Sequence, residues 1–120
     1  FVPYELVVKL KEKGFKQTCF GLYDNHKVLH TNKKYVFEDD ESNILAPLYQ
    51  QVIDWFLDKH KIYITEKANE LLTHFSCKVW KSEKTGHTAY QQGKWTETYP
   101  YGLSRYEALD IAIEEALKLI

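Results

Sequence analysis

Residues 104–120 constrain the fold most strongly, because they join a helix start signal to an uninterrupted apolar stripe. Ser104 and Glu107 have the S-x-x-E spacing of a capping box, which satisfies backbone N–H groups at the start of a helix. The apolar side chains that follow at helical spacing are Leu109, Ala112, Ile113, Ala116, Leu117 and Ile120. Such a face needs a second layer to cover it, so the segment predicts a closing helix in a layered domain.

A second well-marked helix is predicted at the start of the chain. Pro3 suits a first helical turn, where its missing N–H costs nothing. One apolar stripe is formed by Val2, Leu6, Val7 and Leu10. Gly14 supplies the left-handed residue that ends a helix, and Phe15 is expected to pack back onto Leu10 in a Schellman stop.

A third helix is predicted to begin near Ala46-Pro47. Its apolar face has spacings of four, seven and eight residues and consists of Leu48, Val52, Trp55 and Phe56. Between this helix and the first, residues 18–23 and 27–31 are typical of a β-hairpin. Asp24-Asn25 is expected to form its two-residue turn, since both residue types tolerate positive φ.

The remaining strands are predicted from alternation and from β-forming residues. They cover 62–65, 74–80, 87–91 and 94–99, with a further short strand considered at 35–37. The segment 66–72 fits either a helical turn or a loop.

The resulting element order is α-β-β-α-β-β-β-β-α. It predicts an α+β fold, in which a mostly antiparallel sheet of about five to six strands packs with three helices. The stretch from Lys27 to Ile64 also fits a right-handed crossover with one parallel strand pair. No linker divides the chain, so residues 1–120 are expected to form a single domain.

Composition limits the kinds of partner that the protein binds and the cellular compartment in which it is expected. The 16 basic and 17 acidic residues nearly cancel, which argues against strong non-specific binding of nucleic acid. The longest apolar runs are far shorter than the roughly 20 residues that a membrane-spanning helix needs. Cys19 and Cys77 form neither a disulfide framework nor a metal motif and predict a reducing, cytoplasmic setting. The sequence contains no methionine, so we expect that it was trimmed or that its numbering begins after the protein's own start residue.

No motif predicts catalysis, a metal or a cofactor. The five histidines lack the helical i, i+4 spacing of a zinc site, and the acidic run 38–41 lacks the glycine and closing glutamate of a calcium loop. There is no G-x-S-x-G nucleophile motif and no glycine-rich phosphate loop. We therefore expect a protein that is not an enzyme and that carries no cofactor and no metal.

Aromatic residues are the unusual feature, since they make up 15% of the chain. Strand alternation places Tyr63 on the sheet face away from Ile62 and Ile64. It likewise places Trp80 on the face away from Cys77 and Val79. If helices cover both faces of the sheet, these rings belong to the core. If one face is open, they form a surface for a protein partner or for a homodimer.

The functional hypothesis is that a partner or a second copy covers either this open face or the groove beside the second helix. The predicted anchors are Tyr63, Trp80, Tyr90 and Trp95. The alternative is a module that stacks single-stranded nucleic acid on the same rings with help from Lys78, Lys81 and Lys94. No membrane partner is expected.

The chain also resembles a group of small uncharacterised proteins of gut bacteria and their phages or prophages. The resemblance is carried by residues 10–15, by Ala46-Pro47 with 51–55 and 59–62, and by 106–109 with 113–120. These positions are helix caps, helix faces and a helix–strand junction, so they specify a fold rather than a catalytic site. The resemblance implies an intracellular accessory protein from a mobile genetic element and implies no functional residues. The order of elements is also similar to phage domains in which helices enclose a sheet.

Overall fold

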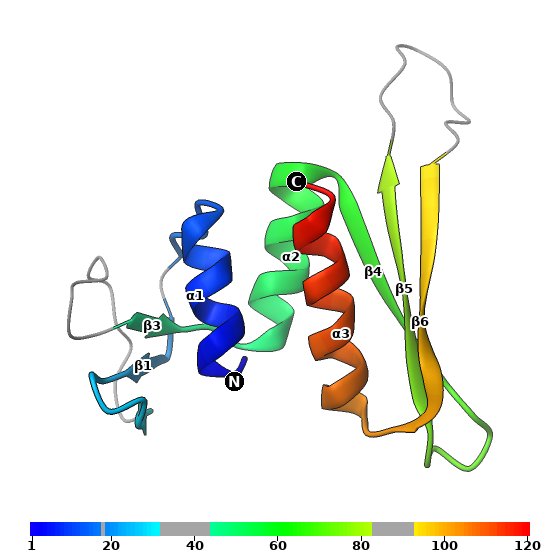
Figure 1. Cartoon of the computed structure of the whole chain (residues 1–120), viewed down its shortest axis with the longest axis horizontal. Helices are drawn as coiled ribbons and strands as arrows, with labels where there is room; N and C mark the ends of the chain where they lie inside the picture. The colour runs from blue at the N-terminus through cyan, green and yellow to red at the C-terminus, as the bar shows by residue number, and fades with distance from the viewer. Residues whose placement is uncertain (18, 32–43, 83–92) are drawn as a thin grey trace. The chain divides into compact units, whose positions relative to one another are not determined.

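A computed structural model describes residues 1–17, 19–31, 44–82 and 93–120, with backbone only for 93–103. These residues form an α+β fold with three helices and six strands (Figure 1). In chain order the elements are α1 (Tyr4–Glu12), β1 (Gly21–Tyr23), β2 (Leu29–His30), β3 (Ile44–Ala46), α2 (Tyr49–His60), β4 (Ile62–Ala68), β5 (Phe75–Ser82), β6 (Gly93–Leu103) and α3 (Arg105–Lys118).

The strands form two sheets rather than one. Strands β2-β1-β3 make one three-stranded sheet, and strands β4-β5-β6 make the other. Every described pairing is antiparallel. The prediction of a single sheet of five to six strands, and of a parallel pair, is therefore wrong. Strands β2, β5 and β6 each pair with the strand that precedes them along the chain, whereas β3 pairs with β1.

The chain divides into two compact units, Phe1–Val52 and Ile53–Ile120. A single domain over residues 1–120 stays a prediction. Within the first unit, α1 packs on β3, and the backbone N–H of Val2 donates to the carbonyl of Pro47 at 3.0 Å. The Tyr23 hydroxyl donates to the Val2 carbonyl at 2.7 Å, which ties β1 to the start of the chain.

The hairpin between β1 and β2 differs from its prediction. Tyr23 pairs with Leu29, so the loop has five residues instead of two. The carboxylate of Asp24 accounts for this length, because Oδ1 accepts from the backbone N–H groups of His26 at 2.8 Å and of Val28 at 3.0 Å. Lys27 takes the left-handed conformation, with φ of 62°.

The end of α1 confirms the predicted Schellman stop. Gly14 has φ of 93°, and the N–H groups of Gly14 and Phe15 donate to the carbonyls of Lys11 and Leu10. Phe15 and Leu10 are both buried.

Gly14→Ala should destabilise the protein by about 1 kcal/mol, because an L-residue pays roughly that much to adopt the left-handed conformation. A Cβ at this position would meet no atom within 4 Å, so conformation alone sets the cost. Gly14→Asn should cost less, since asparagine tolerates this region. Urea unfolding of both variants checks the prediction, and equal losses would contradict it.

In the second unit, α3 packs along the sheet of β4, β5 and β6 (Figure 1). The predicted cap is present, since the N–H of Glu107 donates to Ser104 Oγ at 3.2 Å. Five of the six predicted stripe residues are buried: Leu109, Ala112, Ile113, Ala116 and Leu117. Ile120 lies beyond the helix and is 39% exposed. The predicted strand over 74–80 appears as β5, whereas 66–72 divides into the end of β4 and a turn.

Candidate functional site

Strand register brings predicted aromatic anchors together. Tyr63 on β4 lies directly opposite Trp80 on β5, and Trp80 pairs in turn with the backbone of Trp95 on β6. Directly opposed residues on antiparallel strands occupy the same face of a sheet. We call these three register positions the aromatic row. Tyr90, the fourth predicted anchor, lies outside the described residues.

Burial shows which face of the sheet carries the row. Ile62 and Ile64 of β4 and Cys77 and Val79 of β5 are buried, and they alternate with the aromatic positions. These buried residues occupy the face on which α3 packs. The aromatic row therefore occupies the opposite face, where Tyr63 remains 42% exposed.

An ion pair fixes α3 against its own face of the sheet. The Arg105 guanidinium donates from Nε to Glu66 Oε1 at 2.6 Å and from a terminal nitrogen to Oε2 at 3.0 Å. The hydrogen bonds from Arg105 to Glu66, with the charge of that carboxylate, raise the pKa of Arg105. This two-point contact joins β4 to the first turn of α3, on the sheet face that the helix covers.

Polar residues continue the sheet face away from α3 beyond the aromatic row. Thr65 pairs with Lys78, and the next pair on the same face is Lys67 with Ser76. Lys78 also pairs with the backbone of Glu97 on β6. The face therefore changes along the strands from aromatic to polar, with only a small excess of positive charge.

The three lysines predicted to assist nucleic-acid binding are divided between the two faces. Lys78 shares the face of Trp80, as residues two apart on a strand do. Lys81 pairs with Ile62 on the α3 face, where its Nζ donates to the Leu119 carbonyl after the end of α3. The backbone of Lys94 pairs with Lys81 and so belongs to the same register position. The arrangement does not assemble the predicted basic cluster.

Neither cysteine resembles an activated nucleophile. Both are buried, and no disulfide joins them. Burial, with a further contribution from the charge of Glu66, raises the pKa of Cys77 to about 11. A thiol with such a pKa is protonated at neutral pH, whereas nucleophilic catalysis uses the thiolate.

Asp24 and His30 form a carboxylate–imidazole pair that sequence reasoning missed. Asp24 Oδ2 lies 2.8 Å from His30 Nε2, and this contact, followed by the N–H of Val28, lowers the pKa of Asp24 to about 2. Asp24 and His30 are six residues apart in the sequence, and only a known length of the hairpin loop would have shown that they meet. No described serine, threonine or cysteine is hydrogen-bonded to His30, so the pair closes a loop and activates no described nucleophile.

His60, the last residue of α2, forms an aromatic cluster with Trp55 and Phe56. The His60 ring packs edge-on against Trp55 with centroids 4.6 Å apart. Burial, followed by the positive charge of Lys81, lowers the pKa of His60 below its ordinary value of 6.5.

This lowered pKa predicts an acid-sensitive stability. The unfolded chain binds a proton at His60 at higher pH than the folded chain does, so stability is fully present above pH 6.5 and declines below it. His60→Phe keeps the ring contact and removes the titration. Urea unfolding at about pH 7.5 and about pH 5.5 should show a smaller decline for the variant. An unchanged decline would assign the sensitivity to other groups.

The described residues include no group of three or more His, Cys, Asp or Glu side chains arranged to hold a metal ion. Of the helices in the described ranges, none is long and apolar enough to cross a membrane. The absence of a cofactor, a metal and enzymatic activity remains a prediction.

Comparison with known proteins returns no relative. No protein-family model matches the chain, and neither a curated protein nor a solved structure matches it.

Proposed function

We propose that this chain is a non-enzymatic binding module whose aromatic row docks onto a protein partner. The observation that carries the proposal is the direct opposition of Tyr63 and Trp80 on the sheet face away from α3. Three of the four anchors inferred from sequence occupy one cross-strand row in this arrangement.

Aromatic side chains of this kind concentrate binding energy. Tyrosine and tryptophan bury large, rigid surfaces and are enriched among residues whose truncation weakens an interface most. The polar pair next to the row, Thr65–Lys78, supplies one side of the hydrophilic rim that such a centre has. The matching partner has an apolar patch for the rings and hydrogen-bonding groups opposite the Thr65–Lys78 pair.

Charge favours a protein over single-stranded nucleic acid. Binding to a phosphate backbone requires several basic side chains along one surface. Lys81 lies on the other face and is engaged with the Leu119 carbonyl, while the chain as a whole has a net charge of -1.

The proposal places the module in the cytoplasm, as an accessory protein of phage or prophage origin. The support for this setting is the sequence resemblance, together with two buried cysteines that no disulfide joins. A homodimer through the aromatic row is the competing form of the same proposal.

Affinity capture with matched variants tests the proposed function. The tagged wild type, Tyr63→Ala with Trp80→Ala, and Tyr106→Ala are each exposed to bacterial lysate with and without nuclease. Tyr106 is a suitable control because it is 55% exposed but lies on α3. We expect one protein, identified by mass spectrometry and then purified, to bind wild type and Tyr106→Ala but to lose at least about tenfold in affinity for the double variant.

The salt dependence of affinity distinguishes a protein partner from single-stranded nucleic acid. Affinity for the purified protein should change little between about 50 and about 200 mM salt, whereas affinity for labelled oligothymidine would fall steeply. Tight binding of oligothymidine that the double variant loses would overturn the protein assignment. Light scattering of the wild type and the double variant would reveal a dimer through the row, because only the wild type would have the doubled mass.

A further inference from the structure

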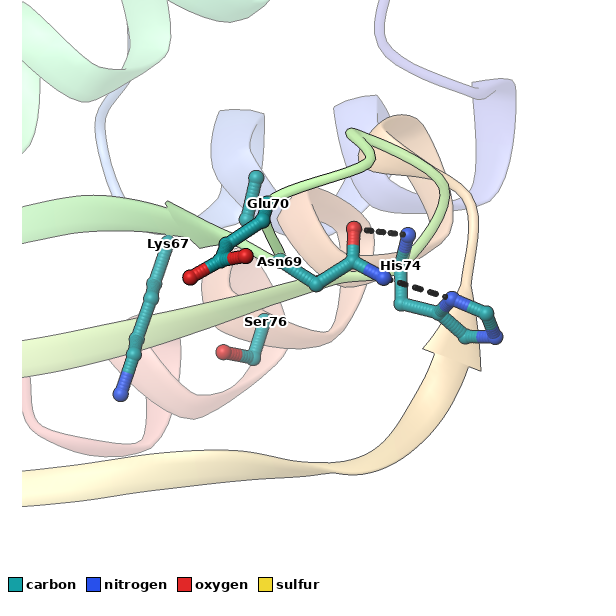
Figure 2. Close-up of a pocket in the computed structure, with 6 residues that line it drawn as sticks. Lys67, Asn69, Glu70, His74 and Ser76 are labelled. Atoms are coloured by element: carbon teal, nitrogen blue, oxygen red, sulfur yellow. Dashed lines mark hydrogen bonds between the residues drawn. The ribbon is translucent and has the colours of Figure 1, made fainter.

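The tip of the β4–β5 hairpin is a hydrogen-bonded turn built around Asn69. Its Oδ1 accepts from the backbone N–H of Thr73 at 2.8 Å. The same oxygen accepts from the backbone N–H of His74 at 3.2 Å, and Asn69 Nδ2 lies 3.1 Å from His74 Nδ1 (Figure 2). The backbone N–H of Asn69 also donates to the His74 carbonyl at 3.1 Å. The residues between Asn69 and Thr73 are therefore presented on a fixed frame.

That frame displays two leucines to solvent. Leu71 is 80% exposed and Leu72 is 70% exposed. Leu72 also has φ of 56°, a left-handed conformation that glycine or asparagine adopts at far lower cost. Neither leucine is buried within the chain, so no apolar burial offsets the strained backbone of Leu72. Backbone strain of this kind is found where the surrounding structure maintains a geometry for function.

A hollow of about 290 Å³ lies beside the same tip, lined by Lys67, Ala68, Asn69, Glu70, His74 and Ser76. In Figure 2, Lys67, Glu70 and Ser76 border one space, while the His74 ring is held away by Asn69. The side chains of Lys67 and Glu70 have no hydrogen-bond or ion-pair partner in the described part of the chain. The methyl group of Ala68 and the aliphatic stems of Lys67 and Glu70 give this charged hollow an apolar lining.

We propose that two copies of the chain associate reciprocally through this hairpin. The Leu71–Leu72 tip of each copy enters the hollow of the other, and Lys67 of each copy faces Glu70 of the other. The second copy thus supplies the apolar group that fills the hollow and the charges that pair with those bordering it. This contact uses the tip of the hairpin and lies about four residues along the strands from the aromatic row.

Geometry and charge favour a second copy over other occupants. The tip and the hollow lie side by side on one hairpin, so a two-fold axis makes the contact self-complementary. The hollow has the volume of about ten water molecules, which is ample for an isobutyl side chain. Lys67 and Glu70 have opposite charges, so the region lacks the basic excess that favours an anionic membrane.

Sedimentation velocity over a concentration series tests the proposal. The wild type should show a reversible monomer–dimer equilibrium, because the contact is smaller than a standard stable interface. Leu71→Ser with Leu72→Ser should raise the dissociation constant by about 100-fold, since each copy loses the same apolar group. Leu57→Ser is the matched control, because Leu57 is a 41% exposed leucine on α2.

Charge exchange provides a second readout. Lys67→Glu and Glu70→Lys should each weaken the dimer, and the double variant should restore it because opposite charges again face each other. Trp80→Ala should leave the equilibrium unchanged, which separates this contact from the aromatic row.

Three results would overturn the inference. They are a wild type that stays monomeric at every concentration, a dimer that survives the leucine substitutions, and a double charge variant that is no better than the single variants. Binding of the monomer to phosphatidylglycerol vesicles through the two leucines would instead assign the tip to a membrane and would equally overturn it.

Discussion

Leu109→Ala should destabilise the protein by about 2–5 kcal/mol, the range found when a large buried aliphatic side chain is truncated. Leu109 is 1% exposed, on the stripe of α3 that packs along the second sheet. The substitution removes apolar burial and leaves a cavity that surrounding atoms fill only in part. Urea unfolding followed by circular dichroism measures the loss as a lower midpoint with an unchanged slope.

Leu71→Ala makes the same chemical change at a position that is 80% exposed. Its effect should lie within about 0.5 kcal/mol of wild type when measured at concentrations where the chain is monomeric. Similar losses for the two variants would contradict the assignment of the α3 stripe to the core.

Ala112→Leu should cost about 1–3 kcal/mol for the opposite reason, since a larger side chain must be forced into a filled space. Ala108, Ala112 and Ala116 recur every four residues along α3, and each has no exposed surface. These small side chains let the helix backbone approach the sheet closely. A leucine at the middle position separates the two layers or displaces their side chains.

Lys118→Leu introduces the same residue at the exposed end of α3. It removes only a surface ion pair with Glu115, which is worth little. Thermal unfolding should therefore show a clear decrease in Tm for Ala112→Leu and a small change for Lys118→Leu. A stabilised Ala112→Leu variant would show that space remains between α3 and the sheet.

The helices could be predicted from sequence because their signals are local. Gly14 with Phe15 marks the end of α1, and Ser104 with Glu107 marks the start of α3. Each signal involves residues fewer than six positions apart. The alternation that places Ile64 and Val79 in the core is likewise visible in the printed sequence.

The division of the strands into two sheets could not be predicted in the same way, because strand pairing depends on contacts between residues far apart in the sequence. Nothing near Ile44–Ala46 indicates that this short strand joins β1. The length of the first hairpin depends on the side chain of Asp24, which forms two backbone hydrogen bonds. The end of β4 depends on its full pairing with β5 as far as Ala68–Phe75.

The candidate site was predictable in its residues but not in its arrangement. Alternation identified Tyr63 and Trp80 as lying away from the core. Their direct opposition is a matter of register, and a shift of one residue would have moved one of them to the other face. The hairpin tip at Leu71–Leu72 was missed, because the segment fitted a helical turn or a loop equally well.

Site-specific photo-crosslinking in cells tests the central claim most directly. A benzophenone amino acid replaces Tyr63 in one variant and Tyr106 in another, so that two exposed tyrosine positions on different surfaces are compared. We expect a discrete protein adduct from position 63, reduced by Trp80→Ala, and none of that mass from position 106. Adducts of the same mass from both positions, or none from position 63, would contradict the claim that the aromatic row binds a protein.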